Sequence, residues 1–389
     1  MKIVVTGLIA TYPLGGVAWD YLAYVSGFRR LGHEVFYLED TGQWLYDPHA
    51  NTFTEDVSFN VAHLVDTLGR AGDDMRERWA LRAPDGSYHG AALEQVARAC
   101  QDADLFLNVS GACWLREAYR GARRTAYLDS DPSYSQAKLV AVERGVATED
   151  QKYSVGLIRA HDCFFTFAEN INDPSCAIPT CGITWLPTRQ PIVIDDWPFS
   201  YRPAATAYTT VMSWKTDVTL PNLDGVTYGG KDVEFAKFID LPARTSIPLQ
   251  VALSGAAPHD ELRQRGWQIV DAYEKSCTLD AYRDYLRTSR AEWSIAKNAY
   301  VASRSGWFST RSAAYLALGK PVVVQDTGFR PYYPIGAGIF PFATIDEAAE
   351  AIACVESDYH RHCEAARATA EREFAAEVVL TRLLHDAGL

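Results

Sequence analysis

The residues best suited to bind an anion lie in one stretch, between Lys297 and Phe329. A predicted helix over residues 309–318 begins with Ser309 and Thr310, and the free N–H groups of such a helix end carry partial positive charge. This arrangement suits a diphosphate, although either hydroxyl could simply cap the helix. The same stretch contains three cationic side chains that would strengthen the site: Lys297, Arg304 and Arg311.

Carboxylates that could accept a proton follow two predicted strands of the N-terminal half. Asp129 and Asp131 follow the first, and Glu169 and Asn170 follow the second. Open α/β sheets bind ligands at the carboxyl ends of their strands, so a carboxylate there could deprotonate an acceptor hydroxyl. Asp129 is the first candidate and Asp131 the second, with an ordinary Asp-Pro turn as the alternative. Two carboxylates are a weak metal signal, and we predict no metal site.

Asp20 is a third candidate base. It lies one turn into a predicted helix over residues 17–31, directly after Gly15 and Gly16. We expect the two glycines to form a flexible loop on the acceptor side. An acid in a first helical turn could instead only favour the helix dipole.

Short apolar strands alternate with helices along the chain, which favours parallel, doubly wound sheets. In the N-terminal half we predict strands at residues 3–6, 34–38, 105–109, 125–128 and 163–167, and helices at 17–31, 60–70 and 93–99. In the C-terminal half we predict strands at residues 209–213, 249–253, 291–295 and 321–325, and helices at 233–238, 279–287 and 309–318.

A proline-bearing segment separates the two halves. Prolines occur at 187, 191, 198 and 203, and proline is excluded from helix interiors and central strands. We therefore place a domain boundary near residue 203, with domains over 1–203 and 204–389. The Ala/Glu/Arg-rich tail from residue 345 onward predicts two or three helices.

Composition excludes several function classes. The formal charge of −12 and the absence of a Lys/Arg-rich tract argue against a nucleic-acid partner. The eight cysteines contain no CxxC pair and are expected to be reduced thiols. No signal-like segment or uninterrupted apolar run of about 18 residues occurs, so we expect a soluble, cytoplasmic protein without stable membrane insertion.

The C-terminal half resembles the nucleotide-sugar domain of GT-B glycosyltransferases. The resemblance is carried by three segments in order: Gly306-Trp307-Phe308-Ser309-Thr310, Ala317-Leu318-Gly319-Lys320-Pro321-Val322-Val323 and Asp326-Thr327-Gly328-Phe329. The Gly15-Gly16 pair and the junction Leu31-Gly32-His33-Glu34-Val35 are similar to the N-terminal half of that superfamily. The resemblance implies two Rossmann-like α/β/α domains facing a central cleft, with a helical C-terminal tail.

By this resemblance the chain would transfer a sugar from a nucleoside diphosphate sugar, such as a UDP-sugar, to a small-molecule or saccharide acceptor. No cofactor or metal would be required, since side chains and a helix dipole neutralise the leaving diphosphate. A basic residue after the first strand of the C-terminal domain would reach the donor phosphates, which selects Lys215, with Lys231 in reserve. The other implied donor-binding residues are Lys297, Arg304, Gly306, Trp307, Ser309, Thr310, Arg311, Asp326 and Thr327.

The sequence departs from the better-known branches of the superfamily. The paired glutamates of the glycogen-synthase-like retaining group would fall on Gly306 and Ala314, and the leading histidine of many inverting members is replaced by Arg304. The general base of inverting relatives would fall on Val17, three residues before Asp20. The resemblance is therefore to a divergent branch, and it leaves open whether the anomeric configuration is retained or inverted.

Three other functions fit an α/β chain of this kind. A nicotinamide-dependent oxidoreductase would need G-x-G-x-x-G directly after the first strand, whereas here Gly7 is separated from Gly15 by seven other residues. A non-catalytic nucleotide- or sugar-binding protein is usually exported in bacteria, whereas no signal-like segment was recognised here. A nucleotide-sugar epimerase could share the GT-B architecture and would need no acceptor pocket.

Overall fold

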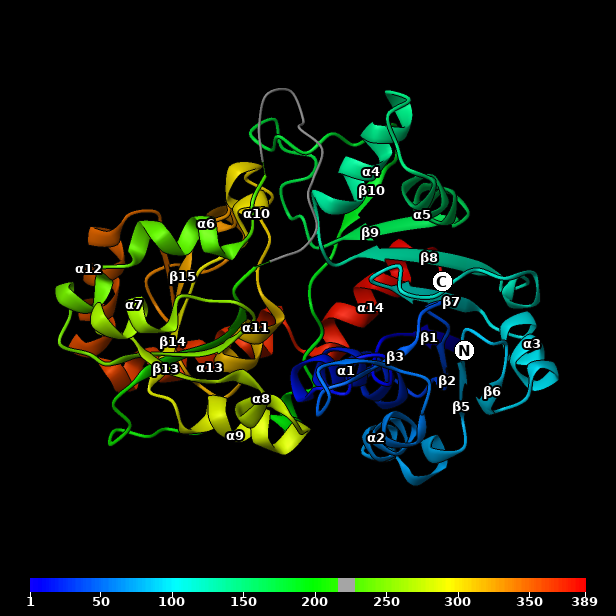
Figure 1. Cartoon of the computed structure of the whole chain (residues 1–389), viewed down its shortest axis with the longest axis horizontal. Helices are drawn as coiled ribbons and strands as arrows, with labels where there is room; N and C mark the ends of the chain where they lie inside the picture. The colour runs from blue at the N-terminus through cyan, green and yellow to red at the C-terminus, as the bar shows by residue number, and fades with distance from the viewer. Residues whose placement is uncertain (216–227) are drawn as a thin grey trace.

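The computed structural model describes residues 1–215 and 228–389. Two α/β units lie side by side, each built on its own sheet (Figure 1). The alternation of strands and helices predicted from the sequence is confirmed in both units. Several short strands and helices were not predicted from the sequence, because brief segments show too little periodicity to be recognised.

The first unit contains a sheet of strand order β10-β9-β8-β7-β1-β2-β5-β6, in which only β6 runs antiparallel to its neighbour. Its central strand β7 (Leu105–Val109) is buried along its whole length, as expected for a parallel strand covered on both faces. The other strands are β1 (Lys2–Thr6), β2 (Glu34–Glu39), β5 (Trp79–Arg82), β6 (Tyr88–Gly90), β8 (Arg124–Asp129), β9 (Cys163–Thr166) and β10 (Trp185–Pro187).

The helices of this unit are α1 (Gly15–Arg30), α2 (Ser58–Gly69), α3 (Leu93–Gln101), α4 (Tyr134–Glu143) and α5 (Glu149–Arg159). A separate antiparallel hairpin, β3 (Leu45–Asp47) and β4 (Thr52–Thr54), projects beside α2. Its strands are too short to be recognised from sequence.

The second unit contains an entirely parallel sheet of strand order β13-β12-β11-β14-β15-β16 within the described residues. Its strands are β11 (Tyr208–Ser213), β12 (Leu249–Ser254), β13 (Gln268–Asp271), β14 (Ala291–Ser294), β15 (Val322–Gln325) and β16 (Ile339–Phe342). Its helices are α6 (Lys231–Phe235), α7 (His259–Gln264), α8 (Ala272–Ser276), α9 (Leu279–Thr288), α10 (Asn298–Ala302), α11 (Thr310–Ala317), α12 (Ile345–Ser357) and α13 (Tyr359–Glu373).

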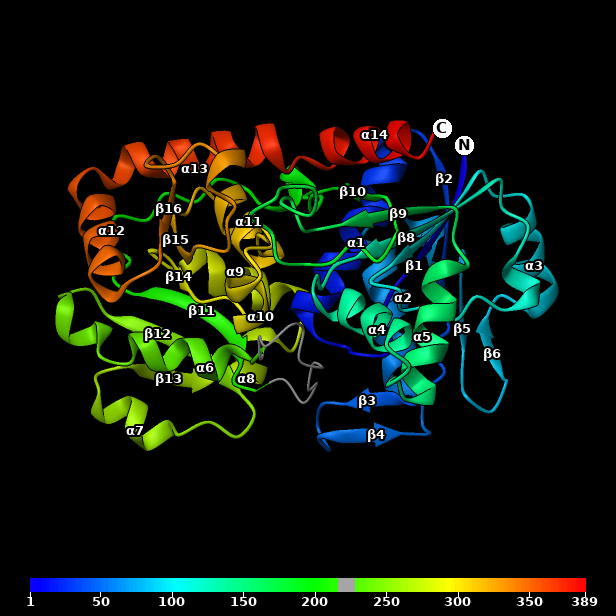
Figure 2. The same cartoon turned by 90° about the horizontal axis from the view of Figure 1, so that it is seen from above.

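The chain crosses between the units twice. Residue 203 lies between β10, the last strand of the first sheet, and β11, the first strand of the second. The predicted helical tail is present, and its last helix α14 (Ala376–Asp386) returns to pack on α1 (Figure 2). The two crossing segments pair where they meet, since Ile192 N–H donates to Phe374 and Ala376 N–H donates to Ile192.

An apolar junction holds the two units together. Phe308, Phe329, Tyr333 and Phe374 form a cluster of aromatic rings with centroids 5.0–6.0 Å apart. These rings belong to one buried core that also contains Trp19 and Phe28 of α1. The units are therefore joined by a continuous core as well as by the two crossings.

The flexible loop predicted at Gly15 and Gly16 is not observed. Gly15 and Gly16 open α1, and they pack against α9 of the other unit. A Cβ atom on Gly15 would lie 2.1 Å from the Thr278 carbonyl oxygen, closer than real Cβ atoms come. The glycines permit this approach, so they bring the N-terminus of α1 to the boundary between the units.

Candidate active site

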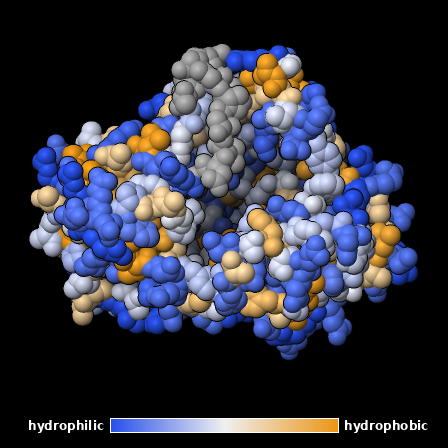
Figure 3. Space-filling view, in the orientation of Figure 1, coloured by the Kyte–Doolittle hydropathy of each residue, from blue (hydrophilic) through white to orange (hydrophobic). Residues whose placement is uncertain are grey.

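A cleft with a cavity of about 870 Å³ separates the two units, and the space-filling view shows a hollow there (Figure 3). One wall is formed by the segment after β1, the start of α1 and the β3–β4 hairpin. The opposite wall is formed by the ends of β11, β12 and β13 and by the start of α11. In parallel sheets, ligands bind at this carboxyl edge, next to the point where the strand order reverses.

The N-terminus of α11 opens into the cleft without a side-chain cap. Ser309 is the N-cap residue, its backbone is extended, and its hydroxyl makes no capping hydrogen bond. Ser309, Thr310 and Arg311 all line the cavity. The first-turn N–H groups of an α-helix have no intrahelical partner, so this helix end offers donors to a bound anion.

Three cationic side chains line the cavity near this helix end: Lys231, Lys297 and Arg311. Arg311 is held by Glu292, whose carboxylate accepts from Nε at 2.8 Å, and by the Val211 carbonyl oxygen, which accepts from Nη1 at 2.7 Å. Burial, together with the neighbouring charges of Arg311 and Lys297, lowers the pKa of Lys231 to about 7. Cations that repel one another in a cleft create a strong site for a polyanion.

Lys297 bridges the two units. Its Nζ lies 2.7 Å from Oδ1 of Asp131, and the Tyr300 hydroxyl also donates to that carboxylate. Burial would raise the pKa of Asp131, but Lys297 and Tyr300 outweigh it and hold the pKa below its ordinary value. Asp131 is therefore ionised and paired.

Asp20 is the second carboxylate of the cleft, and it has a different environment. The residue is exposed to the solvent of the cleft, yet protein atoms surround it closely enough to displace much of its hydration. This loss of hydration raises the pKa of Asp20 to about 7, against the opposing charge of Arg311. A carboxylate with such a pKa can both accept and release a proton near neutrality.

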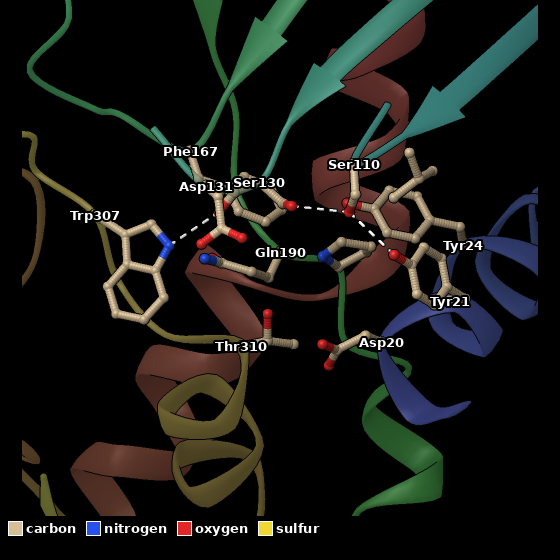
Figure 4. A pocket seen from close by; sticks show the side chains of 12 residues that line it. Asp20, Tyr21, Tyr24, Ser110, Ser130, Asp131, Phe167, Gln190, Trp307 and Thr310 are labelled. Carbon is tan, nitrogen blue, oxygen red and sulfur yellow. Dashed lines mark hydrogen bonds between the residues drawn. The ribbon is translucent and has the colours of Figure 1, made fainter. Parts of the chain in front are cut away.

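A smaller cavity of about 180 Å³ adjoins the cleft on the side of the first unit (Figure 4). It shares Asp20, Asp131, Trp307 and Thr310 with the cleft. A chain of hydrogen bonds crosses it. Tyr21 donates to Ser110 at 3.1 Å, Ser130 donates to Ser110 at 2.8 Å, and Trp307 Nε1 donates to the Ser130 carbonyl at 3.2 Å.

Comparison of the sequence with protein-family models and with curated proteins gave no match. Comparison of the structure with solved structures gave many matches. An alpha-glucosyltransferase in complex with UDP and a 13-mer DNA superposes with a TM-score of 0.59 at 11% identity, covering 100% of this chain and 99% of that one.

Two further solved structures also match over nearly all of both chains. HepE of Anabaena in complex with UDP-glucose gives a TM-score of 0.58 at 13% identity, with 100% and 99% of the two chains covered. Sucrose-phosphate synthase of Thermosynechococcus elongatus gives a TM-score of 0.54 at 11% identity, with both chains covered completely. The chain has the GT-B fold. The fold predicted from the resemblance is thereby confirmed.

In this GT-B structure, the residues predicted to act in the site divide into two sets. Those that line the cleft are Gly16, Asp20, Asp131, Lys297, Trp307, Ser309, Thr310 and Arg311. Those that line neither of the two adjoining cavities are Gly15, Asp129, Glu169, Asn170, Lys215, Arg304, Gly306, Asp326 and Thr327.

Asp129 belongs to a buried network instead of the cleft. Its carboxylate accepts hydrogen bonds from Ser135, Gln136 and Thr166 at 2.8–2.9 Å. Burial raises its pKa, although the three hydrogen bonds oppose that effect. The network fixes the turn after β8, on which Asp131 is carried into the cleft.

Glu169 and Asn170 connect the two units of the GT-B fold. The Asn170 amide donates to the carbonyl oxygens of Arg304 and Gly328 at 2.9 Å, while Glu169 accepts from Arg189 and from Tyr333. A Cβ on Gly306 would lie 2.8 Å from the Asn170 nitrogen.

The remaining predicted residues hold loops or face solvent. Asp326 accepts from the Gly328 N–H, and Thr327 donates to the Trp307 carbonyl at 2.6 Å. Lys215 and the side chain of Arg304 are exposed.

Several residues of the two cavities were not recognised from the sequence as parts of a site. They are Tyr21, Tyr24, Ser110, Ser130, Phe167 and Gln190 in the smaller cavity, and Tyr12 and Tyr273 in the cleft. One signal was available, because Tyr24 follows Asp20 by four residues and so lies on the same face of α1. The others come from separate strands and loops, which share no spacing in the sequence.

Neither a metal cluster nor a membrane span was found. Over residues 1–215 and 228–389, no group of three or more His, Cys, Asp or Glu side chains could hold a metal ion. No helix in the same ranges is long and apolar enough to cross a bilayer.

Proposed function

We propose that this chain is a glycosyltransferase that moves a hexose from a UDP-sugar to an acceptor hydroxyl. The observation that carries the proposal is the pair of adjoining cavities. One is lined by cations and an uncapped helix end, the other by hydroxyls and carboxylates, and four residues belong to both. A donor and an acceptor would therefore meet at Asp20, Asp131, Trp307 and Thr310.

Lys231, Arg311 and the first turn of α11 would bind the diphosphate. Negative charge grows on the leaving diphosphate as the glycosidic bond breaks, so fixed positive groups at this point lower the barrier. Arg311 is fixed in place by Glu292 and Val211, so no reorganisation is needed when the charge develops. We propose that these groups neutralise the leaving group without a divalent metal, in which case EDTA leaves the transfer rate unchanged.

Asp20 would take the proton of the acceptor hydroxyl. A general base works best when its pKa lies near the operating pH, and Asp20 meets this condition while Asp131 does not. In the transfer, the acceptor oxygen bonds to the anomeric carbon, the bond from that carbon to the phosphate oxygen breaks, and UDP leaves with the electron pair.

The smaller cavity also favours transfer over epimerisation. A nucleotide-sugar epimerase keeps its sugar on the nucleotide and needs no second cavity. Incubation of the protein with UDP-glucose and a saccharide acceptor, followed by analysis of the sugar products, separates the two reactions, because only the transferase forms a glycoside with the acceptor.

Isothermal titration with UDP and with UDP-glucose tests the donor site directly. Lys231→Met should weaken UDP binding by about 10- to 150-fold, since charge-assisted hydrogen bonds contribute about 1.5–3 kcal/mol. Lys215→Met is the matched control, because Lys215 is exposed and lines neither cavity. Equal losses in both variants, or no binding of UDP to the unmodified protein, would refute the proposal.

A further inference from the structure

The smaller cavity belongs almost entirely to the first unit. Its walls are formed by Asp20, Tyr21 and Tyr24 of α1 and by the residues at the ends of β7, β8 and β9. Of the second unit's described residues, 204–215 and 228–389, only Trp307 and Thr310 line the cavity, at the side where it meets the cleft. A molecule in this cavity would therefore face the donor across the boundary between the units.

The charge of the cavity excludes an anionic occupant. Asp20 and Asp131 line it, and none of its lining residues is Lys, Arg or His. The lysine nearest to Asp131 is Lys297, which is already paired with that carboxylate at 2.7 Å. A phosphate placed here would lie beside the Asp20 carboxylate, with no cation among the lining residues to bind it.

Apart from the two carboxylates, the cavity carries neutral hydroxyl groups that can both donate and accept hydrogen bonds. The hydroxyl of Tyr24 is buried and has no hydrogen-bond partner among the described residues. Tyr21 and Tyr24 lie beside Ser110 and Ser130 in the cavity (Figure 4). Hydroxyl groups match the hydroxyls of a polyol, because each can serve as donor or acceptor.

Apart from Gln190, the remaining walls are apolar. Phe167 and Val109 come from the first unit, and the Trp307 ring closes the side toward the cleft. At about 180 Å³ the cavity is smaller than the roughly 300–1,000 Å³ of sites that hold drug-sized ligands. It has room for one small ring with polar edges, and a base pair or an extended flat molecule would not fit.

We propose that the cavity takes one ring of a neutral saccharide as the acceptor. The inference rests on the proposed function and narrows it, since it excludes sugar phosphates, oligonucleotides and planar aglycones. The Tyr24 hydroxyl would bind a ring hydroxyl, and Asp20 would receive the proton of the hydroxyl that is glycosylated.

The test measures acceptor binding to the protein saturated with UDP. The probes are neutral mono- and disaccharides of glucose, galactose, mannose and N-acetylglucosamine, the 6-phosphates of the same monosaccharides, a single-stranded 13-mer DNA and a planar phenol. Saturation-transfer NMR detects which probes bind, and titration gives their affinities. Tyr24→Phe removes only the hydroxyl. Tyr285→Phe is the matched control, because it removes the hydroxyl of a second buried tyrosine that lies outside this cavity.

A neutral saccharide should bind, and Tyr24→Phe should weaken it roughly 3- to 10-fold, the effect of one lost hydrogen bond. The affinity for UDP should be the same in all three proteins, and Tyr285→Phe should bind the saccharide normally. The inference is overturned if a 6-phosphate binds more tightly than its parent sugar, if only the DNA or the phenol binds, if no neutral saccharide binds, or if Tyr24→Phe has no effect. A protein that does not bind UDP would instead refute the proposed function.

Discussion

Lys297 of the second unit and Asp131 of the first form an ion pair across the cleft, with Nζ 2.7 Å from Oδ1. The sequence predicted the first as a phosphate ligand and the second as a catalytic carboxylate. In the ligand-free cleft they neutralise each other, so we expect the carboxylate to compete for the lysine with the phosphates of the proposed donor.

Asp131→Asn should therefore tighten the binding of UDP, by about 3- to 10-fold at low ionic strength. The variant removes a negative charge from a site for a dianion and leaves Lys297 without its paired carboxylate. Titration at 20 mM and at 500 mM salt checks the electrostatic origin, because the gain should shrink with screening. Asp102→Asn is a control on an exposed carboxylate far from the cleft. Weaker binding of UDP would show that the pair serves to position Lys297.

The affinity for UDP should fall as the pH rises above 7. In the free protein the pKa of Lys231 is about 7, whereas a bound diphosphate favours the protonated amine. Above pH 7, binding must therefore take up a proton, and the affinity decreases by up to tenfold per pH unit. Titrations between pH 7 and 9 in buffers of different ionisation enthalpy measure this uptake. Lys231→Met should bind more weakly and show no proton uptake at this site.

Asp20→Asn should lower kcat by about 10²- to 10⁴-fold, the usual contribution of a general base, and change the affinity for UDP less than threefold. In the unmodified protein the rate should rise with pH through about 7, because the deprotonated carboxylate is the active form. Initial rates between pH 5.5 and 8.5 give the profile. A variant that retains its rate, or a profile without this rising limb, would remove Asp20 from the reaction.

The sequence was sufficient to locate one wall of the cleft, but it did not show which residues of that stretch line it. Lys297, Trp307, Ser309, Thr310 and Arg311 line the cavity, whereas Arg304 and Gly306, in the same stretch, do not. The physical reason is local. Arg304 and Gly306 have φ angles of +51° and +77°, which turn the loop and redirect the side chains that follow. Spacing along a sequence does not reveal such turns.

Whether Lys215 or Lys231 reaches the cleft depends on contacts between residues that are far apart in the sequence. Lys231 is brought to the cleft because the Gly229 N–H donates to the Asn298 side chain at 2.9 Å and the Asn298 N–H donates to Gly230 at 3.2 Å. Nothing within the segment around Lys231 indicates a partner almost 70 residues away. The return of α14 to α1 was unpredictable for the same reason, since it depends on Gly27 fitting against Leu380.

Gly15→Ala should destabilise the protein by about 1–3 kcal/mol, the usual cost of overpacking. The new Cβ would lie 2.1 Å from the Thr278 carbonyl oxygen, which is backbone and cannot easily move. Gly16→Ala is the matched control, because its Cβ would lie 3.2 Å from a Tyr282 ring carbon and alanine favours the helix. The thermal unfolding midpoint should fall clearly in Gly15→Ala and change little in Gly16→Ala. Equal midpoints would show that α1 and α9 separate readily.

Lys320→Met should stabilise the protein at neutral pH. The Lys320 side chain is fully buried, and its Nζ has no hydrogen-bond partner among the described residues. Burial lowers its pKa to about 8, with Arg202, Arg287 and Arg290 adding to the effect and Cys363 opposing it. A methionine of similar length fills the same space without an unpaired ammonium, so we expect a gain of about 1–3 kcal/mol.

The pH dependence of the stability gain shows whether it comes from removing the buried ammonium. Between about pH 8 and the ordinary lysine pKa near 10.4, the unfolded chain binds a proton that the folded chain has released, so the unmodified protein gains stability as the pH rises. The advantage of Lys320→Met should therefore be full at pH 7 and smaller at pH 9.5. Unfolding midpoints at the two pH values measure it, and Lys152→Met is the control, because Lys152 and its ion-pair partner Glu149 are both exposed. If Lys320→Met lowers the unfolding midpoint at pH 7, or if its stability gain is the same at pH 9.5 as at pH 7, the buried ammonium is not the cause.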